Sequence, residues 1–600
     1  MRGRIDLLRG FVALGMSVSL AACGDGGGRG AGGYGSGGGA SGEGTGGFGE
    51  GGGAMDVVIE NGRVVDGTGA AWFYGDVGIR GDRIAAVVPV GGLAGVEAGE
   101  RIDATGKVVA PGFIDIQSHS RGQLLTGDGR LLGKITQGIT TEIMGEGWTN
   151  APANANTHRG AGLVDPEARG ERLDFSGPRG FDRWLRAMAE NGASPNFGSF
   201  VGATTVRVYA KGEAAGDATE AELDTMRAVV RRAMEDGAFG VATALIYPPG
   251  SFASTDELVE VVAASAPHGL YITHLRSEAD RLLEAIDESI EIGERAGVPV
   301  EIYHLKAAGR RNHHKAALAI AKIDSARAAG MDVQADMYPY PAGGTGLSAV
   351  LPPWASEGGA LLDNLRDPEI RQRIHDEVLA DDGDWENLGV LATPEGIMIT
   401  AVAETGPDGE PSGAAGYVGM WLADIAADMG VDWVDAAIEL LLMTQGGTGM
   451  VLFMMTEENI ALQLQQPWIK IGTDAGGHDP ETATGMVHPR SYGTYPRILG
   501  RYVRDQGVIT LEDAVRKMTS AVATRLSIPD RGLLRAGMYA DVVVFDPVTV
   551  GDRATFEEPH QLSVGIEEVF VNGVAVMRGG VHTGAKPGMI VRGAGYRGEG

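Results

Sequence analysis

Cysteine is almost absent from this chain, which has one, Cys23, among its 600 residues. That count excludes an internal disulfide and any cysteine-rich zinc or iron–sulfur site, so a metal would need histidine and carboxylate ligands. Positive charge is also scarce, because 50 Lys and Arg stand against 79 Asp and Glu and leave a net charge of -29. Such a protein repels a phosphate backbone, and nucleic acid is therefore not an expected partner.

Two local signatures of catalysis are missing as well. The chain has neither the G-x-S-x-G elbow of serine hydrolases nor a phosphate-binding P-loop. What it has is 43% hydrophobic residues, enough in a chain of this length to bury a large core, so disorder and fibrous structure are excluded as overall classes.

The first 23 residues form a separate segment. Arginines precede an apolar run that ends in small residues, which is the layout of a secretory signal and is too short to span a bilayer. The sequence Leu20-Ala21-Ala22-Cys23 resembles the lipobox of bacterial lipoproteins, in which lipid is attached to the cysteine. We therefore expect an exported protein of the bacterial cell envelope, facing the periplasm or the exterior, that touches the membrane through a lipid anchor at Cys23. The alternative is an inert cysteine in an uncleaved segment.

The rest of the chain divides into regions that differ in composition and hydrophobic pattern. Residues 24–54 are a flexible linker, with 19 glycines among 31 residues. Residues 55–110 and 536–600 both carry short β-branched runs separated by turn signals such as Asn-Gly, and we expect them to form one small β-sandwich. Between them, in residues 111–535, apolar strands alternate with helical patterns, which indicates repeated β-α units around a parallel sheet.

Eight strand candidates occur in this middle part, the number that a (β/α)8 barrel requires. In chain order they are GFIDIQSH, GITTEIMG, NFGSFVG, FGVATALIY, LYITHLR, VEIYHLK, DVQADMYPY and WIKIGTDA. The connection between the last two, residues 341–467, is far longer than an ordinary loop of this fold. We expect it to hold an inserted subdomain over the mouth of the barrel.

Polar side chains of the metal-ligand type stand at the ends of several of these strands. Gln117 and His119 are two residues apart at the end of the first strand and so face the same side. The second, fifth, sixth and eighth strands supply Glu146, His274, His304 and Asp474. Barrel active sites lie where the strands end, and burying such groups unpaired is costly, so the pattern predicts a metal centre.

This ligand set suits Zn²⁺, although Mn²⁺, Fe²⁺ and Co²⁺ accept the same donor types. Taken singly, each histidine is better explained as a structural residue than as a ligand, and it is their joint position at the strand ends that favours a metal. Glu146 is likewise explained as a helix cap or a solvated side chain.

Long segments of the chain resemble a known family between about Asp56 and about Gly588. They include VVAPGFIDI, ITQGITT, ALIYPPGSFASTDEL, YITHLR, HLKAAGRRN, ADMYPYPAGGTGLSAVLPPW, IGTDA, HPRSYGTYPRILGRYV, AVRKMTS and RGLLRAGMYADVVVFDP. On these motifs the chain is similar to the amidohydrolase superfamily and, within it, to the N-acyl-D-amino-acid deacylases, or D-aminoacylases.

The resemblance implies roles for single residues. His274 and His304 match the family's metal ligands on strands five and six, and His119 matches the second histidine of its His-x-His. Asp474 matches the catalytic aspartate, which takes a proton from the metal-activated water and passes it to the leaving amine.

Three further matches concern the substrate. Tyr247, Lys306 and Arg490 match residues that bind its carboxylate or position its amide. The two cations suit a small anionic N-acylated substrate, and arginine adds a bidentate fork. Structural ion pairs are the alternative reading of Lys306 and Arg490.

Two positions depart from the family pattern. Gln117 stands where the first histidine of His-x-His is usual, and Glu146 stands where many D-aminoacylases have a cysteine. Because an amide oxygen is a weak zinc ligand, we expect one tightly bound ion on Glu146, His274 and His304. A second, weaker position would then involve His119, Gln117 and Asp474.

The resemblance thus implies a metal-dependent hydrolase of the linear amide of N-acyl-D-amino acids or related small N-acyl compounds. Two alternatives remain at this point. A cyclic-amide hydrolase of the dihydroorotase or hydantoinase kind would share the fold, although the HLK, YPPG and HPR motifs favour the deacylase. A non-catalytic ligand-binding lipoprotein would explain the missing first histidine, although the presence of Asp474 argues against it.

Overall fold

The computed structural model describes residues 53–157 and 173–598. The predicted signal segment, Cys23 and nearly all of the glycine-rich linker lie outside these residues. Among the helices in the described part, none has the length and apolar character needed to cross a membrane.

Eight parallel strand segments of the middle region form the barrel, and each falls within one of the eight predicted runs. They are β6 (Phe113–Asp115), β7 (Ile139–Met144), β8 with β9 (Asn196–Ser199 and Val201–Gly202), β10 (Gly240–Ala244), β11 (Leu270–His274), β12 (Val300–Ile302), β13 (Val333–Met337) and β17 (Ile469–Ile471). One sheet has the order β6-β7-β8 and the other β9-β10-β11-β12-β13-β17. The α/β barrel class expected from the sequence is therefore confirmed.

The barrel closes between its first and last strands. A parallel bridge pairs Ser118 with Ala475, and the Asp474 amide donates to the Gln117 carbonyl at 2.9 Å. The buried ammonium of Lys134, on the short helix α2 (Leu132–Ile135), reinforces this seam. Its Nζ donates to Asp115 Oδ2 at 2.6 Å and to the Ala475 carbonyl at 2.7 Å. The ends of β6 and β17 are thus held together, and these ends carry His119 and Asp474.

Helices surround the strands, and consecutive ones pack against each other from α4 to α8. Their apolar residues recur at helical spacing: in α5, Met226, Val229, Val230 and Ala233 are buried. This helix begins with a capping box between Thr219 and Glu222. The helices of this region are α1 (Arg121–Leu125), α3 (Gly180–Asn191), α4 (Ala203–Lys211), α5 (Glu220–Glu235), α6 (Thr255–Ala263), α7 (Leu282–Ala296), α8 (Lys315–Ala328), α14 (Glu457–Leu464), α15 (Arg490–Arg497), α16 (Leu511–Met518) and α17 (Ser520–Arg525), with a π-helical turn over Ile498–Asp505.

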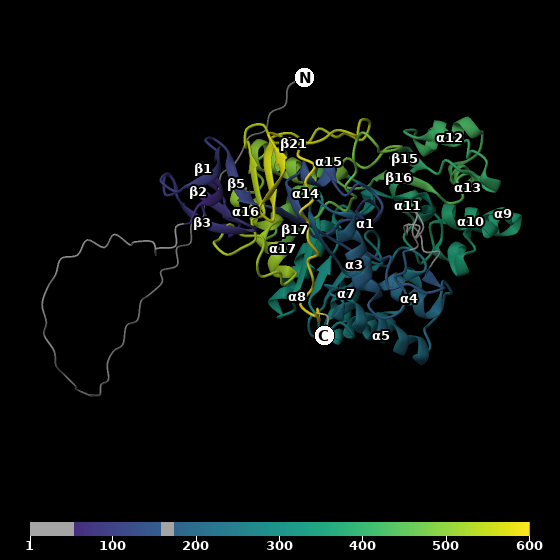
Figure 1. Ribbon diagram of the computed structural model, residues 1–600. Coiled ribbons are helices and arrows are strands. Elements are labelled where there is room, and N and C mark those ends of the chain that lie inside the picture. The colour runs from purple at the N-terminus through teal and green to yellow at the C-terminus, as the bar shows by residue number, and fades with distance from the viewer. Residues whose placement is uncertain (1–52, 158–172, 599–600) are drawn as a thin grey trace, which may run out of the picture. The chain divides into compact units, whose positions relative to one another are not determined.

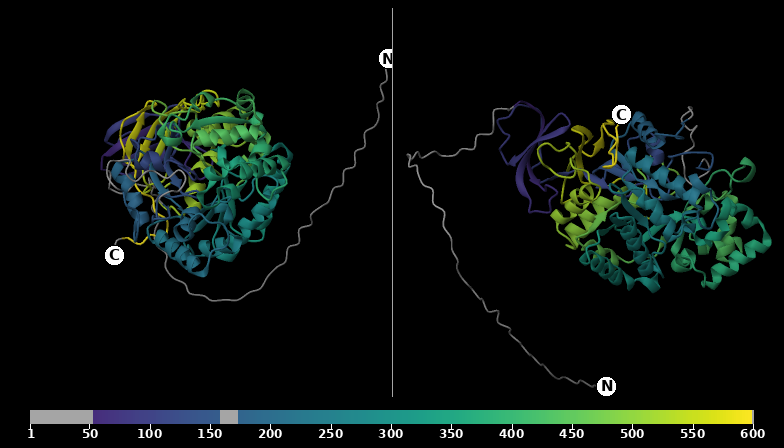
Figure 2. Two further views of the ribbon diagram at one scale, coloured as in Figure 1. Left: turned by 90° about the vertical axis from the view of Figure 1, so that its right-hand side faces the viewer. Right: turned by 90° about the horizontal axis from the view of Figure 1, so that it is seen from below.

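Strands from both chain ends join in one nine-stranded sheet, seen side by side in purple and yellow in Figures 1 and 2. The first group is β1 (Met55–Val64), β2 (Phe73–Arg80), β3 (Arg83–Pro89), β4 (Ala98–Asp103) and β5 (Val108–Pro111); the second is β18 (Val542–Phe545), β19 (Ile566–Val571), β20 (Val574–Arg578) and β21 (Val581–His582). The antiparallel pairing of β5 with β18 joins the two groups.

The two Asn-Gly signals behave differently in this sheet. Asn572-Gly573 forms the expected two-residue turn between β19 and β20, with φ of 50° and 78°. Asn61-Gly62 does not end a strand. It forms a bulge inside β1, where the register with β2 shifts and a Cβ on Gly62 would collide with the side chain of Val109.

The long connection between β13 and β17 folds as an insertion with its own core (Figure 1, green). An antiparallel sheet of order β14-β16-β15 is accompanied by five helices. The elements are β14 (Ala342–Gly346), α9 (Leu361–Arg366), α10 (Pro368–Ala380), α11 (Leu388–Ala392), β15 (Ile397–Val402), α12 (Leu422–Met429), α13 (Trp433–Met443) and β16 (Thr448–Phe453). Helix α13 has the sequence WVDAAIELLLM, and Asp432 caps it by accepting from the amides of Val434 and Asp435.

Candidate active site

Five of the predicted ligand side chains meet at the end of the barrel where its strands finish. His119 and Asp474 follow β6 and β17, Glu146 follows β7, and His274 and His304 stand at or just after the ends of β11 and β12. His304 and Asp474 have positive φ values of 34° and 50°, a backbone region that costs free energy for residues other than glycine. At His304 a compensating contact is present, because its amide donates to Asp336 Oδ1 at 2.8 Å.

Glu146 lies at the centre of two overlapping groups of ligands. In the first group its Oε1 is 3.1 Å from His274 Nδ1 and 3.5 Å from His304 Nε2. In the second group its Oε2 is 3.5 Å from His119 Nε2, which is itself 2.8 Å from Asp474 Oδ1. Within each group the candidate ligand atoms lie within 4.8 Å of one another.

Gln117 reaches the same carboxylate through its amide nitrogen. Its Nε2 donates to Glu146 Oε2 at 2.5 Å, whereas its Oε1 is buried and has no hydrogen-bond partner among the described residues. The structure therefore brings Gln117 to the cluster and leaves its oxygen, the atom that could bind a metal, unpaired.

The donor set fits a divalent metal. Glu146, His274 and His304 are nearly enclosed and supply one carboxylate and two imidazole donors without sulfur, the three-ligand pattern of catalytic zinc sites. Unpaired buried polar atoms such as Gln117 Oε1 are rare in proteins, and an adjacent cation would satisfy this one. Glu146, His274 and His304 would hold a first ion, and His119, Asp474 and Gln117 surround a second position.

The charges of the two carboxylates are fixed by their neighbours. Burial raises the pKa of Glu146, but hydrogen bonds from His119, His274 and His304 outweigh it and hold the pKa well below its usual range. Burial also acts against ionisation of Asp474, yet the guanidinium of Arg490 and the hydrogen bond with His119 lower its pKa to about 2. Both groups are therefore anionic at neutral pH.

The three predicted substrate-binding residues line the same cavity of about 740 Å³. Lys306 Nζ is 2.6 Å from Glu278 Oε1, and Arg490 Nη1 is 2.7 Å from Asp474 Oδ2. The ring of Tyr247 lies edge-on to His274, with 5.2 Å between ring centroids. Lys306 and Arg490 therefore form ion pairs and also lie at the site, because both ion pairs line the cavity.

The insertion supplies one wall of this cavity. Its lining residues there include Gly344, Thr345, Ser348, Leu351, Trp385 and Glu386. The barrel ends and the insertion thus enclose a space of a size typical for a small organic ligand.

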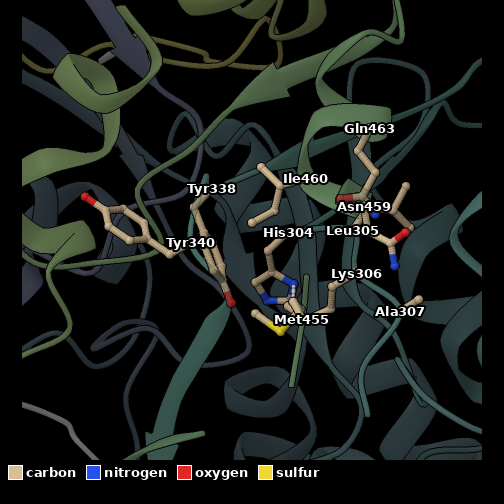
Figure 3. A pocket seen from close by; sticks show the side chains of 10 residues that line it. All are labelled: His304, Leu305, Lys306, Ala307, Tyr338, Tyr340, Met455, Asn459, Ile460 and Gln463. Atoms are coloured by element: carbon tan, nitrogen blue, oxygen red, sulfur yellow. Dashed lines mark hydrogen bonds between the residues drawn. The ribbon is translucent and has the colours of Figure 1, made fainter. Parts of the chain in front are cut away.

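Two residues at the site were not identified from the sequence. Tyr338, after β13, lies beneath both cations, with its ring centroid 4.6 Å from Arg490 Cζ and 5.7 Å from Lys306 Nζ. Glu278 contacts Lys306 and both buried histidines. Figure 3 shows Tyr338, His304 and Lys306 side by side. Tyr338 belongs to the quoted motif ADMYPYP, but nothing in the spacing of Glu278 distinguishes it from the other carboxylates of the chain.

Comparison with known proteins agrees with this geometry. A model of the amidohydrolase family matches residues 466–577. A D-aminoacylase from Alcaligenes xylosoxydans xylosoxydans is 35% identical over 543 residues, which cover 90% of this chain and 97% of that protein.

Two solved structures are similar over the same share of the chain. One is a D-aminoacylase with a TM-score of 0.73 at 33% identity. It is described in terms of the functional role of its binuclear metal centre, with activation by one metal and attenuation by the second. The other is an N-acyl-D-glutamate deacylase from Bordetella bronchiseptica in complex with zinc and a phosphonate mimic of the tetrahedral intermediate, also with a TM-score of 0.73 at 33% identity. Each match covers 90% of this chain and 100% of the other.

Proposed function

This chain belongs to the D-aminoacylase family of amidohydrolases, metal-dependent hydrolases of linear amides, and on that premise we propose that it releases D-amino acids from small N-acyl-D-amino acids. One observation carries the proposal: Glu146, shared by two groups of ligands, lies in the same cavity as Asp474, Lys306 and Arg490. That cavity combines a metal site, a proton acceptor and two cations suited to a substrate carboxylate.

We propose Zn²⁺ as the ion, with one tightly bound position on Glu146, His274 and His304 and a weaker one beside His119, Gln117 and Asp474. A bound divalent metal polarises the acyl carbonyl and lowers the pKa of an attacking water. The ligand types support zinc because imidazole and carboxylate donors without sulfur suit it, although Mn²⁺ and Co²⁺ share them.

Asp474 is the group that moves the proton. Its carboxylate is ionised because Arg490 lies 2.7 Å from Oδ2, so it can accept a proton from the attacking water. Once protonated, it can pass that proton to the nitrogen of the leaving amine. His119, 2.8 Å from Oδ1, holds the carboxylate in place during both steps.

Lys306 and Arg490 receive the substrate's free carboxylate, with Tyr247 positioning the amide. Both cations are buried, so a charge-assisted hydrogen bond there is stronger than one at the surface. The Lys306 ammonium has three donors, of which Glu278 takes one, and this leaves capacity for a substrate oxygen.

We expect the protein, expressed without its first 23 residues and reconstituted with zinc or manganese, to hydrolyse N-acetyl-D-amino acids in a metal-dependent way. Replacing the substrate's carboxylate by a neutral amide should lower kcat/KM about 10–100-fold, because a hydrogen bond to a charged group contributes about 1.5–3 kcal/mol. The measurement is amino-acid release from a panel of D and L substrates, with hydantoins and dihydropyrimidines as cyclic-amide controls. Turnover confined to the cyclic amides, or no turnover by the metal-loaded protein, would contradict the proposal.

We also propose that the protein is exported and held at the cell envelope by lipid on Cys23. The supporting features are the apolar run after Arg2, Arg4 and Arg9 and the Leu-Ala-Ala-Cys sequence. In a Gram-negative host, the full chain is expected in the membrane fraction and labelled by radioactive palmitate. Cys23→Ser should abolish the label and shift the protein out of that fraction. Equal labelling of wild type and variant would exclude Cys23 as the lipid site.

A further inference from the structure

Glu278 is a buried carboxylate in the loop that follows β11, four residues after His274. It is 5% exposed and lines the cavity beside the metal ligands. No step of the proposed reaction uses it. A buried carboxylate with no chemical task of its own needs another explanation, because burying its charge is costly.

Its contacts are with the ring nitrogens that point away from Glu146. Oε1 of Glu278 is 2.9 Å from His304 Nδ1, and its Oε2 is 3.6 Å from His274 Nε2. The opposite nitrogens, His304 Nε2 and His274 Nδ1, face Glu146. The two imidazoles are thus placed between two carboxylates, one on the metal side and one behind.

Two groups lie within hydrogen-bonding distance of His304 Nδ1, which are Glu278 Oε1 at 2.9 Å and Lys306 Nζ at 2.7 Å. A metal on the side of Glu146 needs the lone pair of Nε2. The neutral imidazole that offers this lone pair carries its proton on Nδ1, where the Glu278 carboxylate can accept it and the Lys306 ammonium cannot. Carboxylates behind metal-binding histidines act in this way in other metal sites, fixing ring orientation and raising ligand basicity. Here the carboxylate is within hydrogen-bonding distance of His304 only, and at 3.6 Å from His274 Nε2 it acts on that ring through its charge.

The same carboxylate holds Lys306. Lys306 Nζ is 2.6 Å from Glu278 Oε1 and 2.7 Å from His304 Nδ1, so the ammonium, the imidazole and the carboxylate meet at one point. The dashed contact between His304 and Lys306 is visible in Figure 3. Lys306 balances the buried charge of Glu278, and Glu278 keeps the long lysine side chain in a single position.

The insertion keeps the loop of Glu278 in place. Oε2 of Glu386 accepts from Ser277 Oγ at 2.6 Å, from the Glu278 amide at 2.6 Å and from the Ala279 amide at 3.0 Å. A second anchor comes from the barrel, where the Ala308 amide donates to the Glu278 carbonyl at 2.8 Å. Glu278 is therefore fixed by its main chain as well as by its side-chain partners.

We propose that Glu278 is a positioning residue that serves both halves of the site, orienting His304 for the metal and holding Lys306 for the substrate, while its charge also stabilises the neighbouring His274. The metal half rests on the proposed ion position at Glu146, His274 and His304, and the substrate half rests on the proposed role of Lys306. A single buried carboxylate then links metal affinity to recognition of the substrate carboxylate.

The test compares Glu278→Gln with Lys306→Met. Metal affinity is measured on the metal-free protein by competition for Zn²⁺ with a chromogenic chelator, and KM is measured at saturating metal. Glu278→Gln, which keeps the size and removes the charge, is expected to weaken zinc binding about 10–100-fold, as loss of a partner behind a ligand does. It should also raise KM. Lys306→Met should raise KM and leave zinc affinity close to that of the wild type.

A matched control is Glu291→Gln on α7, an exposed glutamate paired with Arg295, which should change neither quantity. Wild-type zinc affinity in Glu278→Gln would overturn the proposal, and so would a loss of zinc affinity with unchanged KM. If Glu278→Gln does not fold, Glu278→Asp replaces it. This variant keeps the charge but moves it back by one methylene, so we expect a smaller loss of zinc affinity and a smaller rise in KM. Zinc binding is measured without substrate, so failure to hydrolyse N-acyl-D-amino acids would overturn the proposed function separately.

Discussion

Asp474→Asn is expected to lower kcat about 10²–10⁴-fold, the range that a positioned general acid and base contributes. Asparagine preserves the shape of the side chain: its amide oxygen can face Arg490, and its amide nitrogen then faces His119, whose Nε2 can accept when the ring carries its proton on Nδ1. What is lost is the ability to accept a proton from water and return it to the amine. The measurement is kcat and KM on an N-acetyl-D-amino acid, with zinc content determined on the same preparations.

The control for this variant is Asp505→Asn, at a half-exposed carboxylate that pairs with Arg504 away from the cavity. It should behave as the wild type. An unchanged rate in Asp474→Asn would remove Asp474 from the mechanism. If the variant instead lost its tightly bound zinc together with its activity, Asp474 would be a ligand of the first ion rather than the proton shuttle.

Glu146→Gln is expected to weaken zinc binding and to lower activity by the same factor. Loss of a residue that only hydrogen-bonds a metal ligand costs about 10–100-fold in affinity, and loss of the ligand Glu146 itself should cost more. The reason is that both ligand groups depend on this one carboxylate. Its Oε1 faces His274 and His304, and its Oε2 faces His119 and Gln117. A neutral amide there leaves the first position, on His274 and His304, without a carboxylate ligand, and leaves the second position with Asp474 alone. Zinc content after dialysis and activity at rising zinc concentration measure both effects.

His375→Gln provides a stringent control for Glu146. His375, Asp432 and Asp435 on the insertion form another group with ligand atoms within 4.8 Å, but they lie at the partly exposed surface and not in the cavity. The variant should keep full zinc content and activity. Loss of zinc from His375→Gln, with zinc retained by Glu146→Gln, would place the tightly bound ion on the insertion. Two stoichiometric, tightly held ions in the wild type would contradict the expectation of a single firm position.

The ligand residues could be predicted because strand ends are readable in the sequence. Buried parallel strands appear as short apolar runs, and polar residues directly after such runs belong to the rim of the barrel. This is how His119, Glu146, His274, His304 and Asp474 were identified. The helices α5 and α7 could be predicted for a similar reason, since their apolar spacing is local.

Other features could not be predicted because they depend on contacts between distant segments. Asn61-Gly62 has the composition of a turn, but its pairing with β2 and the close approach of Val109 make it a bulge. Tyr338 gains its role from Lys306 and Arg490, which are far away along the chain. The partners of Glu278 come from two strand ends and from the insertion.

The sequence by itself determined the barrel, the identity of its strands, the ligand types at their ends and the family to which the chain belongs. These features follow from local hydrophobic periodicity and from motifs that are contiguous in the chain. Only the tertiary structure decided that Glu146 is shared by two ligand groups, that Gln117 turns its amide nitrogen towards it, and that Glu278 joins the histidines to Lys306. Side-chain direction and charge pairing depend on barrel closure and on how the insertion packs, and neither is encoded in any one segment.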